Sequence, residues 1–494
     1  MRVLLMQPPL LNARSSKVFP STSHASLAAV LLPLPDVEVK VFDGLLDRLY
    51  EDQDEDAARK HLQDTIRDFQ PDLIGVSHTY SWYCDDVAWA AAAIREASDA
   101  PVVMGGNHAT VCYEDVLAKG EADIVVRGEG EQTLVELVQR MAAGEDVTEV
   151  AGTAGRRNGE TYLNAPRSLI DDLDTLPIPA WGAFPMHKYF YFNSPALNMR
   201  RPKAIMLTSR GCMGSCVFCA AHNIWGRRKW RGRTPDKVLD EIELLYHEYG
   251  VREIDFEDDN LAADPERLAA ICHLIRDRKL DFRWKAPGGI GHWTIDLELL
   301  KLMRASGCYR LTFGIESASP KNRRWLGKNW DLGQASEIIN AAHDMGMWVN
   351  ATFIIGTPVE TREDIEETVN WYKNSNIDFM SFAAPLPLPG TPMRKTYERL
   401  GYDVSLEALD EYTRGPYATE HFTKEEITQI HADIKKMAMR RLFTRFLNPL
   451  TLLKKINSVE DARYVFGLMR FYAGLALRGR SVQDLSIQQA KRLS

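Results

Sequence analysis

Short apolar segments alternate with segments of helical periodicity through the first third of the chain. The short apolar segments predict strands at 2–7, 37–43, 72–78, 101–106 and 122–128. Between them, apolar residues recur at helical spacing, as at 57–69 and 85–97, and predict crossover helices. This alternation is typical of a parallel sheet covered on both faces, so the pattern predicts a doubly wound, Rossmann-like domain.

The loops that follow these strands are the candidate binding loops of the first domain. In open α/β sheets a ligand binds beyond the carboxyl ends of the strands. The loops concerned start at Gln7, Ser77, Gly105 and Gly128. We therefore expect a ligand site at this edge of the sheet.

A second α/β pattern begins after a region rich in Pro, Gly and polar residues. Six further strands are predicted at 204–211, 252–259, 282–288, 310–317, 348–356 and 379–387. Six strands in order are fewer than the eight of a closed barrel, so a partial barrel is expected, followed by a mainly helical end. The predicted domains are 1–140 (Rossmann-like), 141–197 (connecting region), 198–395 (partial barrel) and 396–494 (helical region).

Length and composition indicate an enzyme-sized globular protein. The 494 residues exceed what one core usually supports, and 45% hydrophobic with 26% charged residues gives no reason to expect extensive disorder. Prolines interrupt the apolar start of the chain, and no apolar run approaches the roughly 20 residues that span a bilayer. The expectation is therefore neither a signal peptide nor a membrane span, and a cytoplasmic protein.

Positive charge is concentrated near the carboxyl end. Residues 431–480 carry a net charge of +8, whereas the rest of the chain carries −16. The segment 435–456 interleaves cations with apolar residues at near-helical spacing, broken by Pro449. It fits either a helical cap with a solvated basic face or a contact with an anionic lipid surface or lipid-like substrate. Nucleic acid is not expected as a partner, because the rest of the chain is acidic and contains no RNA-binding motif.

Three of the seven cysteines lie in one short loop. The sequence GCMGSCVFC places Cys212, Cys216 and Cys219 as CxxxCxxC directly after the first strand of the second domain. Three thiolates can hold three irons of a four-iron cluster and leave the fourth iron open to a chelating ligand. A structural zinc site with His222 as a fourth donor is the alternative. The remaining cysteines are isolated in sequence, and we assign no catalytic residue.

The cysteine loop and the strands around it resemble the radical S-adenosylmethionine (SAM) superfamily, over residues of about 200–395. The resemblance implies a partial (β/α)6 barrel, a 4Fe–4S cluster on the three cysteines and SAM chelated to the open iron. One electron then cleaves SAM to methionine and a 5′-deoxyadenosyl radical, which abstracts hydrogen. The electron is expected to come from a donor such as flavodoxin or ferredoxin.

The same resemblance implies SAM contacts at the ends of three later strands. The segments that carry it are REIDFEDDN, RLTFGIESAS and FIIGTPVET. The implied residues are Glu257, Asp258 and Asp259 for the amino group, Glu316 and Ser317 for the ribose, and Gly356 for the adenine. The family's common Gly-Gly-Glu form is absent at the first of these segments. The alternative for REIDFEDDN is a solvated acidic strand end, and the alternative for RLTFGIESAS is a capped strand end.

The first domain resembles the cobalamin-binding domain that precedes the barrel in one large radical SAM subfamily. The segments concerned are PVVMGGNHAT and ADIVVRGEGE. The implied cobalamin contacts are Ser77, Gly105, Gly106, His108, Thr110 and Gly128. The loop after the first strand reads QPPLLNARSS and lacks the usual DxHxxG motif. Any cobalamin would therefore lack the histidine of that motif as its lower ligand. A domain that has kept the fold without the corrin remains the alternative.

The expected function is therefore a cobalamin-dependent radical SAM enzyme that modifies an unactivated carbon of a small molecule. C-methylation and oxidative cyclisation or rearrangement, as in the anaerobic cyclase relatives, both stay open. A radical SAM enzyme without cobalamin and a non-catalytic, metal-stabilised binding protein are the further alternatives. The basic carboxyl-terminal region leaves peripheral membrane contact open, together with a lipid-like substrate.

Overall fold

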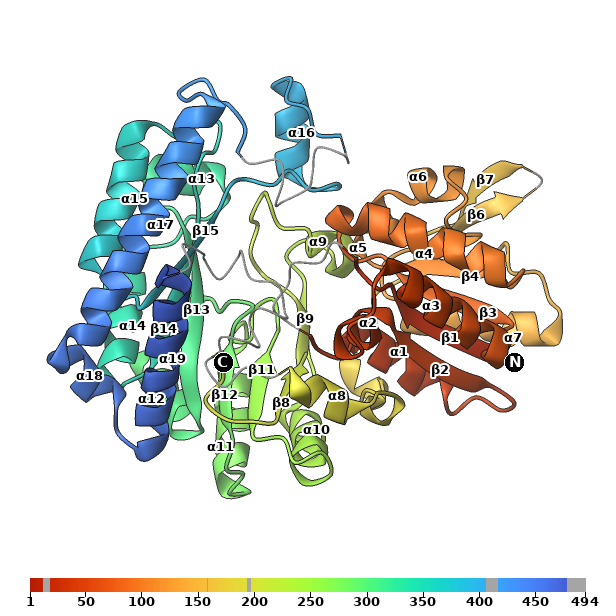
Figure 1. Cartoon of the computed structure of the whole chain (residues 1–494), viewed down its shortest axis with the longest axis horizontal. Helices are drawn as coiled ribbons and strands as arrows, with labels where there is room; N and C mark the ends of the chain where they lie inside the picture. The colour runs from red at the N-terminus through yellow and green to blue at the C-terminus, as the bar shows by residue number, and fades with distance from the viewer. Residues whose placement is uncertain (12–17, 158, 193–196, 406–415, 478–494) are drawn as a thin grey trace.

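The computed structural model describes residues 1–494 apart from 12–17, 158, 193–196, 406–415 and 478–494. Two α/β units lie side by side, and the carboxyl-terminal helices α17 (Lys424–Leu447), α18 (Pro449–Lys455) and α19 (Val459–Leu477) lie on the far side of the second unit (Figure 1). No helix of the described ranges is long and apolar enough to cross a membrane.

The first unit is a seven-stranded sheet with the order β2-β1-β3-β4-β5-β6-β7. Its strands are β1 (Arg2–Gln7), β2 (Glu38–Asp43), β3 (Leu73–Ser77), β4 (Val102–Gly105), β5 (Ile124–Val126), β6 (Thr153–Arg157) and β7 (Glu160–Leu163). Its helices are α1 (Thr22–Leu31), α2 (Gly44–Tyr50), α3 (Glu55–Phe69), α4 (Cys84–Ala97), α5 (Asn107–Val111), α6 (Tyr113–Ala118) and α7 (Glu131–Ala143). The first five strands in chain order pair in parallel, whereas β6 and β7 are antiparallel.

Both faces of this sheet are buried. Because side chains alternate along a strand, Val3 and Leu5 of β1 pack with α1 and α7, whereas Leu4 and Met6 pack with α3 and α4. Continuous apolar strands are typical of a parallel sheet with helices on both faces. The predicted Rossmann-like fold is thereby confirmed.

The second unit is a six-stranded parallel sheet with the order β15-β14-β13-β12-β11-β8. Its strands are β8 (Lys203–Met206), β11 (Glu253–Phe256), β12 (Arg283–Ala286), β13 (Cys308–Glu316), β14 (Trp348–Ile354) and β15 (Phe379–Ala383). Its helices are α10 (Pro235–His247), α11 (Pro265–Asp277), α12 (Leu297–Ala305), α13 (Pro320–Trp325), α14 (Leu332–Asp344), α15 (Arg362–Asn374) and α16 (Pro392–Arg399). Two antiparallel strands, β9 (Ser209–Gly211) and β10 (Trp230–Gly232), and the helices α8 (Met186–Tyr191) and α9 (His222–Trp225) complete the described elements around it.

All the strands that the sequence predicts are present, and the sheet of six confirms the partial barrel. The region 141–197 contains more structure than expected, since β6 and β7 extend the first sheet at β5. These two strands are short and mostly polar, which explains why the apolar pattern does not reveal them. The domain limits at 140, 197 and 395 stay predictions.

The carboxyl-terminal helices are joined to the barrel by an aromatic cluster and a buried charge. Phe446 of α17 and Phe471 of α19 pack with Trp348 at the start of β14. The carboxylate of Asp378 accepts hydrogen bonds from Lys455 and Arg445, each at 2.8 Å. Burial by itself would raise the pKa of Asp378, but the two cations outweigh burial and hold that pKa below its usual value of 3.8.

We expect Asp378→Asn to lower the free energy of unfolding by about 3–5 kcal/mol, because it leaves two buried cations without their anion. Urea unfolding followed by circular dichroism measures this loss. Since the folded pKa is depressed, the difference from the wild type is complete at neutral pH and shrinks only as pH falls below 3.8. The control Asp344→Asn, which removes an exposed partner of Lys454, should cost no more than about 1 kcal/mol. Equal effects of the two variants would contradict the assignment.

Candidate functional site

A cavity of about 490 Å³ lies between the carboxyl-end loops of the first sheet and the mouth of the barrel. Ser77, Gly105 and Gly128 line it from the first unit, and Arg210 and Asp259 line it from the barrel. Figure 1 shows α5 and α9 meeting at this junction. The loops predicted from strand order thus form one wall of a shared space.

Glycines keep the first wall of the cavity open. Gly106 has φ +112°, and a Cβ there would lie 2.7 Å from the carbonyl oxygen of His78. Gly128 has φ +83°, and a Cβ there would meet no atom within 4 Å, so it would stand in open space. A Cβ on Gly105 would make only ordinary contacts, the nearest at 3.8 Å. These residues fit a slot that a bulky ligand tail could enter.

The other predicted residues of this wall support its shape. Ser77 Oγ lies 3.1 Å from Thr79 Oγ1, and Thr110 Oγ1 accepts a hydrogen bond from the Gly128 amide at 3.1 Å. Tyr80 and Trp82 stack with ring centroids 4.6 Å apart and also line the cavity. His108 lines the cavity too, but it is 2% exposed and its Nε2 faces Cys84.

The two units are joined at the cavity by a buried ion network. Arg210, two residues before Cys212, donates to Glu129 at 2.6 Å and to Glu131 at 2.5 Å. Arg231 donates to the second oxygen of Glu129 at 2.9 Å. Burial alone would raise the pKa of Glu129, but the hydrogen bonds from Arg231 and Arg210 outweigh it and hold the pKa below its usual value. The GEGE segment therefore fixes the strand that leads into the cysteine loop.

A second connection lies on the other side of the cysteine loop. Asn107 donates to the carbonyl of Ala220 at 2.8 Å and accepts from Asn223 at 3.0 Å. Asn223 also donates to the carbonyl of Pro389 at 3.1 Å. Sequence reasoning missed Asn107 and the Arg210 network as interface residues. The sequence offered one indication, namely that Asn107 directly follows the glycine pair and Arg210 lies just before the cysteine motif.

The three cysteines of the loop are half-buried and free. Three cysteines suit a four-iron cluster with one open iron, whereas a structural zinc site requires a fourth donor such as His222. Burial raises the pKa of each thiol, to about 12 for Cys219, so thiolates here require a bound cation. The Gly214 amide also donates a hydrogen bond to the sulfur of Cys212, at 3.3 Å.

The acidic residues after β11 differ in their surroundings. Glu257 and Asp259 line the cavity, and Asp259 accepts a hydrogen bond from the Gly211 amide at 3.1 Å. Asp258 is fully buried and accepts from the hydroxyls of Thr208 at 2.8 Å and Ser209 at 2.5 Å. Glu257 and Asp259 are therefore the ones placed to meet a ligand, whereas Asp258 holds the start of the cysteine loop.

The later strand ends form a connected rim. Glu316 has φ +64° and accepts from Lys328 at 2.9 Å and Thr352 at 3.2 Å. Ser317 is fully buried, with its hydroxyl 3.1 Å from that of Thr368. Gly356 has φ +99°, and its amide donates to Glu360 at 2.6 Å, so a buried carboxylate holds this loop.

A second cavity of about 460 Å³ occupies the barrel interior. Thr352, which bonds Glu316 at the rim, lines it, as do Arg310 and Phe379. The Arg310 guanidinium lies 4.4 Å from the centroid of the Phe379 ring. Within the described residues no carboxylate lies within salt-bridge distance of Arg310, so this cation faces the cavity without a paired anion.

Comparison with known proteins gives the same two parts. Residues 206–372 match the family model of the radical SAM superfamily, and residues 24–138 match that of the B12 binding domain. An uncharacterized methyltransferase of Pyrococcus horikoshii is 32% identical over 96% of this chain and 99% of its own length. The cytidylyl-2-hydroxyethylphosphonate methyltransferase of Streptomyces wedmorensis is 30% identical over 77% of this chain and 78% of its own.

A more distant relative and a solved structure extend the comparison. The anaerobic magnesium-protoporphyrin IX monomethyl ester cyclase of Rubrivivax gelatinosus is 26% identical over 96% of this chain and 82% of its own. The cobalamin-dependent SAM radical enzyme OxsB has the same fold, with a TM-score of 0.68 at 17% identity, over 96% of this chain and 73% of that chain.

A B12-type domain facing a partial barrel with a three-cysteine loop defines a cobalamin-binding radical SAM enzyme. The chain belongs to the radical SAM superfamily, among its members with an amino-terminal B12-binding domain. It is an enzyme of the methyltransferase or cyclase type, and its cofactors are a 4Fe–4S cluster, SAM and cobalamin. The predicted class, fold and cofactors are confirmed.

We expect Glu129→Gln to destabilise the junction by about 3 kcal/mol, because Arg210 and Arg231 lose their shared buried anion. The urea midpoint should fall, and limited proteolysis should cut the region 141–197 faster. The control Glu136→Gln removes a more exposed partner of Arg167 and Arg140 and should change stability by about 1 kcal/mol or less. An unchanged midpoint and cleavage rate for Glu129→Gln would show that the network does not join the two units.

Proposed function

We propose that this enzyme transfers a methyl group to an unactivated carbon of a small molecule. The single observation that carries the proposal is that one cavity is lined both by the open glycine loops and by the acidic end of β11 beside the cysteine loop. Cofactors bound at these two walls would face one another without an intervening layer of protein. The two relatives reported above at 30% identity or more are both methyltransferases, which supports methyl transfer over the oxidative rearrangement of the cyclase relative.

We assign the cluster to Cys212, Cys216 and Cys219. When bound, the cluster and SAM supply a 5′-deoxyadenosyl radical, and cobalamin supplies a carrier for the methyl group. The chain's own residues position these groups and exclude water. The Arg210 network fixes the segment before Cys212, and the Asn107 contacts fix the segment after Cys219.

SAM binding is assigned to the rim of the barrel. Glu257 and Asp259 face the cavity and suit the cationic amino group, whereas Asp258 acts by holding Thr208 and Ser209. Glu316 offers a carboxylate oxygen for the ribose hydroxyls, and Ser317 beside it accepts a hydrogen bond from the Ser319 amide at 3.2 Å and so supports the loop. Gly356 would let the backbone approach the adenine ring because it has no side chain, and its φ of +99° disfavours any residue that has one.

Cobalamin binding is assigned to the glycine wall of the first domain. Ser77, Gly105, Gly106 and Gly128 form a slot for the nucleotide tail, and Thr110 holds the amide of Gly128. His108 lines the same cavity and belongs to this wall. The DxHxxG motif is absent after β1, so a corrin bound here would lack that histidine, and Tyr80 and Trp82 are aromatic residues of the cavity wall that would be available to contact it.

The substrate is proposed to be a small molecule that reaches the barrel interior, where the cavity of about 460 Å³ suits a ligand of that size. Arg310 favours a substrate with an anionic group, since a guanidinium binds carboxylate and phosphate well. The electron that SAM cleavage needs is proposed to come from a separate protein such as flavodoxin or ferredoxin. The four cysteines outside the cysteine loop are isolated in sequence and do not suggest a second cluster.

The function can be tested without knowing the substrate. Anaerobic full-length protein is reconstituted with iron, sulfide and hydroxocobalamin and then incubated with SAM and dithionite. We expect S-adenosylhomocysteine in proportion to the bound corrin, together with 5′-deoxyadenosine, both quantified by mass spectrometry. Deoxyadenosine with bound corrin but no S-adenosylhomocysteine would favour the oxidative alternative and overturn methyl transfer.

Two variants separate the cofactors in this experiment. Cys216→Ala should lose cluster iron and deoxyadenosine while still binding corrin. Gly105→Leu should lose corrin absorbance while keeping cluster iron, because its side chain fills the slot. Gly105→Ala is the matched control and should keep most of the corrin, since its Cβ makes only ordinary contacts. Corrin binding by Gly105→Leu at the wild-type level would place cobalamin elsewhere.

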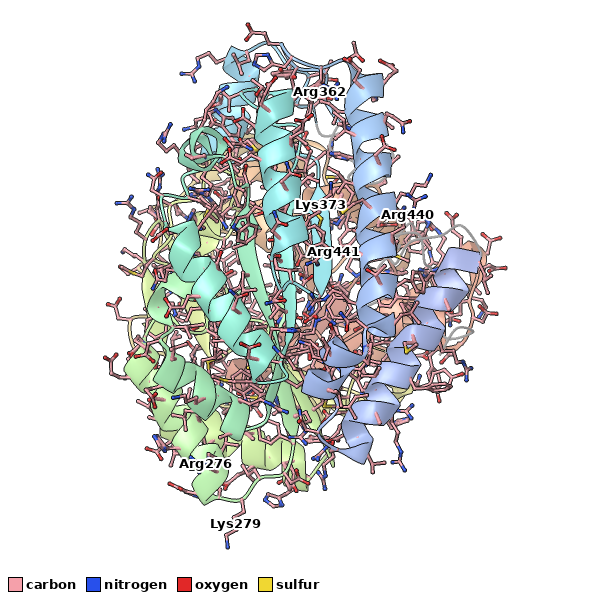
Figure 2. All side chains as sticks on the ribbon, turned by 90° about the vertical axis from the view of Figure 1, so that its left-hand side faces the viewer. Arg276, Lys279, Arg362, Lys373, Arg440 and Arg441 are labelled. Atoms are coloured by element: carbon pink, nitrogen blue, oxygen red, sulfur yellow. The ribbon has the colours of Figure 1, made fainter. Side chains whose placement is uncertain are left out.

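We further propose that the basic carboxyl-terminal region contacts an anionic membrane surface, where a lipid-like substrate would be found. Leu447, Leu450 and Leu453 are 73%, 71% and 73% exposed around the start of α18. Lys454 is exposed beside them, and Arg440 is exposed further along α17. Figure 2 shows Arg440 on the outer side of α17, while Arg441 lies between α17 and α15. Exposed leucines flanked by cations are typical of interfacial helices.

We expect the protein to co-sediment with vesicles that contain phosphatidylglycerol, less strongly at high salt and not with neutral phosphatidylcholine vesicles. The variant Leu450→Ser/Leu453→Ser should lose most of this binding. Leu400→Ser is the control, because Leu400 is 54% exposed and directly follows α16, which lies away from this region. Equal binding by all three proteins, or no binding by the wild type, would leave the solvated helical cap as the correct interpretation.

A further inference from the structure

A second group of metal-type donors lies in the first domain, apart from the cysteine loop. His78 follows β3, Cys84 begins α4 and His108 lies in α5. The sulfur of Cys84 lies 3.7 Å from Nε2 of His78 and 3.7 Å from Nε2 of His108. Across the part of the chain that the structure describes, this is the one trio of His, Cys, Asp or Glu whose ligand atoms all lie within 4.8 Å.

These separations match those around one tetrahedral zinc ion. Zinc binds sulfur at about 2.3 Å and histidine nitrogen at about 2.0–2.1 Å, which places the two ligand atoms about 3.6 Å apart at the tetrahedral angle. The two sulfur–nitrogen distances here are each 3.7 Å. Sulfur is a weak hydrogen-bond partner, so these two contacts by themselves satisfy the imidazole nitrogens poorly.

The hydrogen bonds around the trio are incomplete without an ion. The Cys84 thiol donates its one proton to the carbonyl of Ser81, at 2.9 Å. His78 is only 1% exposed and its Nδ1 has no partner, so this buried imidazole has no strong hydrogen bond. His108 differs, because its Nδ1 lies 2.9 Å from Ser81 Oγ. Such a partner on the far nitrogen orients the other nitrogen of a histidine toward a metal.

We propose that His78, Cys84 and His108 bind a zinc-class divalent ion, with a water molecule as the fourth ligand. On binding, the Cys84 thiol releases its proton to solvent and forms a sulfur–metal bond, and each imidazole donates a nitrogen lone pair. The ion joins the end of β3, the start of α4 and helix α5. These segments carry Tyr80, Trp82 and Asn107 to the cavity wall, so the metal has a positioning role there.

Elemental analysis of the full-length protein tests the site. The protein is purified anaerobically, reconstituted with cluster, supplied with zinc and desalted. We expect roughly one zinc per chain beyond the cluster iron, falling at least about tenfold in Cys84→Ser with the iron content unchanged. Cys112→Ser, another half-buried cysteine of the same domain, is the matched control and should keep its zinc. Zinc at background level in the wild type, or an equal loss in both variants, would overturn the three-donor site.

A spectroscopic measurement covers the case in which Cys84→Ser fails to fold. Full-length protein with Cys212, Cys216 and Cys219 all replaced by Ser is titrated with Co²⁺, which reports thiolate ligation by a near-ultraviolet charge-transfer band. We expect the band to appear and zinc to abolish it. Ser81→Ala should weaken Co²⁺ affinity by about 10–100-fold, since it removes the partner of His108 Nδ1. No band in this protein would disprove the proposal, while leaving the proposed function untouched.

Discussion

The cofactor site depends on a buried carboxylate shared between two arginines. Glu129 belongs to the first unit, and Arg210 and Arg231 belong to the barrel. A charge removed from water is tolerated only when it is paired, so Glu129 requires both partners and fixes the distance between the units. Because Arg210 lies two residues before Cys212, the same interaction places the cysteine loop opposite the glycine loops. The Asn107 contacts to Ala220 and Asn223 hold the other end of that loop.

Buried charges are also paired in the interior of the barrel. Lys285 donates to Glu253 at 2.8 Å, and Lys203 donates to Asp255 at 2.9 Å. These charged pairs join the neighbouring strands β8, β11 and β12 of the six-stranded sheet. Arg310 differs, because its guanidinium lies over the Phe379 ring at the cavity wall and has no carboxylate within salt-bridge distance among the described residues. The cavity of about 460 Å³ is lined by Lys203, Asp255 and Lys285 of these pairs.

The cysteines of this chain include two groups of candidate metal ligands. Cys212, Cys216 and Cys219 lie in one loop of the second unit, whereas Cys84 lies in the first unit, 3.7 Å from Nε2 of each of two histidines. A cluster on the first group would supply redox chemistry, and an ion on the second would order loops that line the cavity of about 490 Å³. Both arrangements use half-buried thiols that ionise only beside a cation.

The sequence by itself determined the two α/β units, the six strands of the barrel and the cysteine loop. These features are local, because apolar periodicity and CxxxCxxC spacing are set by neighbouring residues. It did not reveal β6 and β7, whose pattern is weak, or the different surroundings of Asp258 and Asp259. Only the tertiary structure decided which unit Arg210 pairs with, and that His78, Cys84 and His108 converge. Such contacts join residues from separate strand ends, and their distances depend on how the sheet and its helices pack.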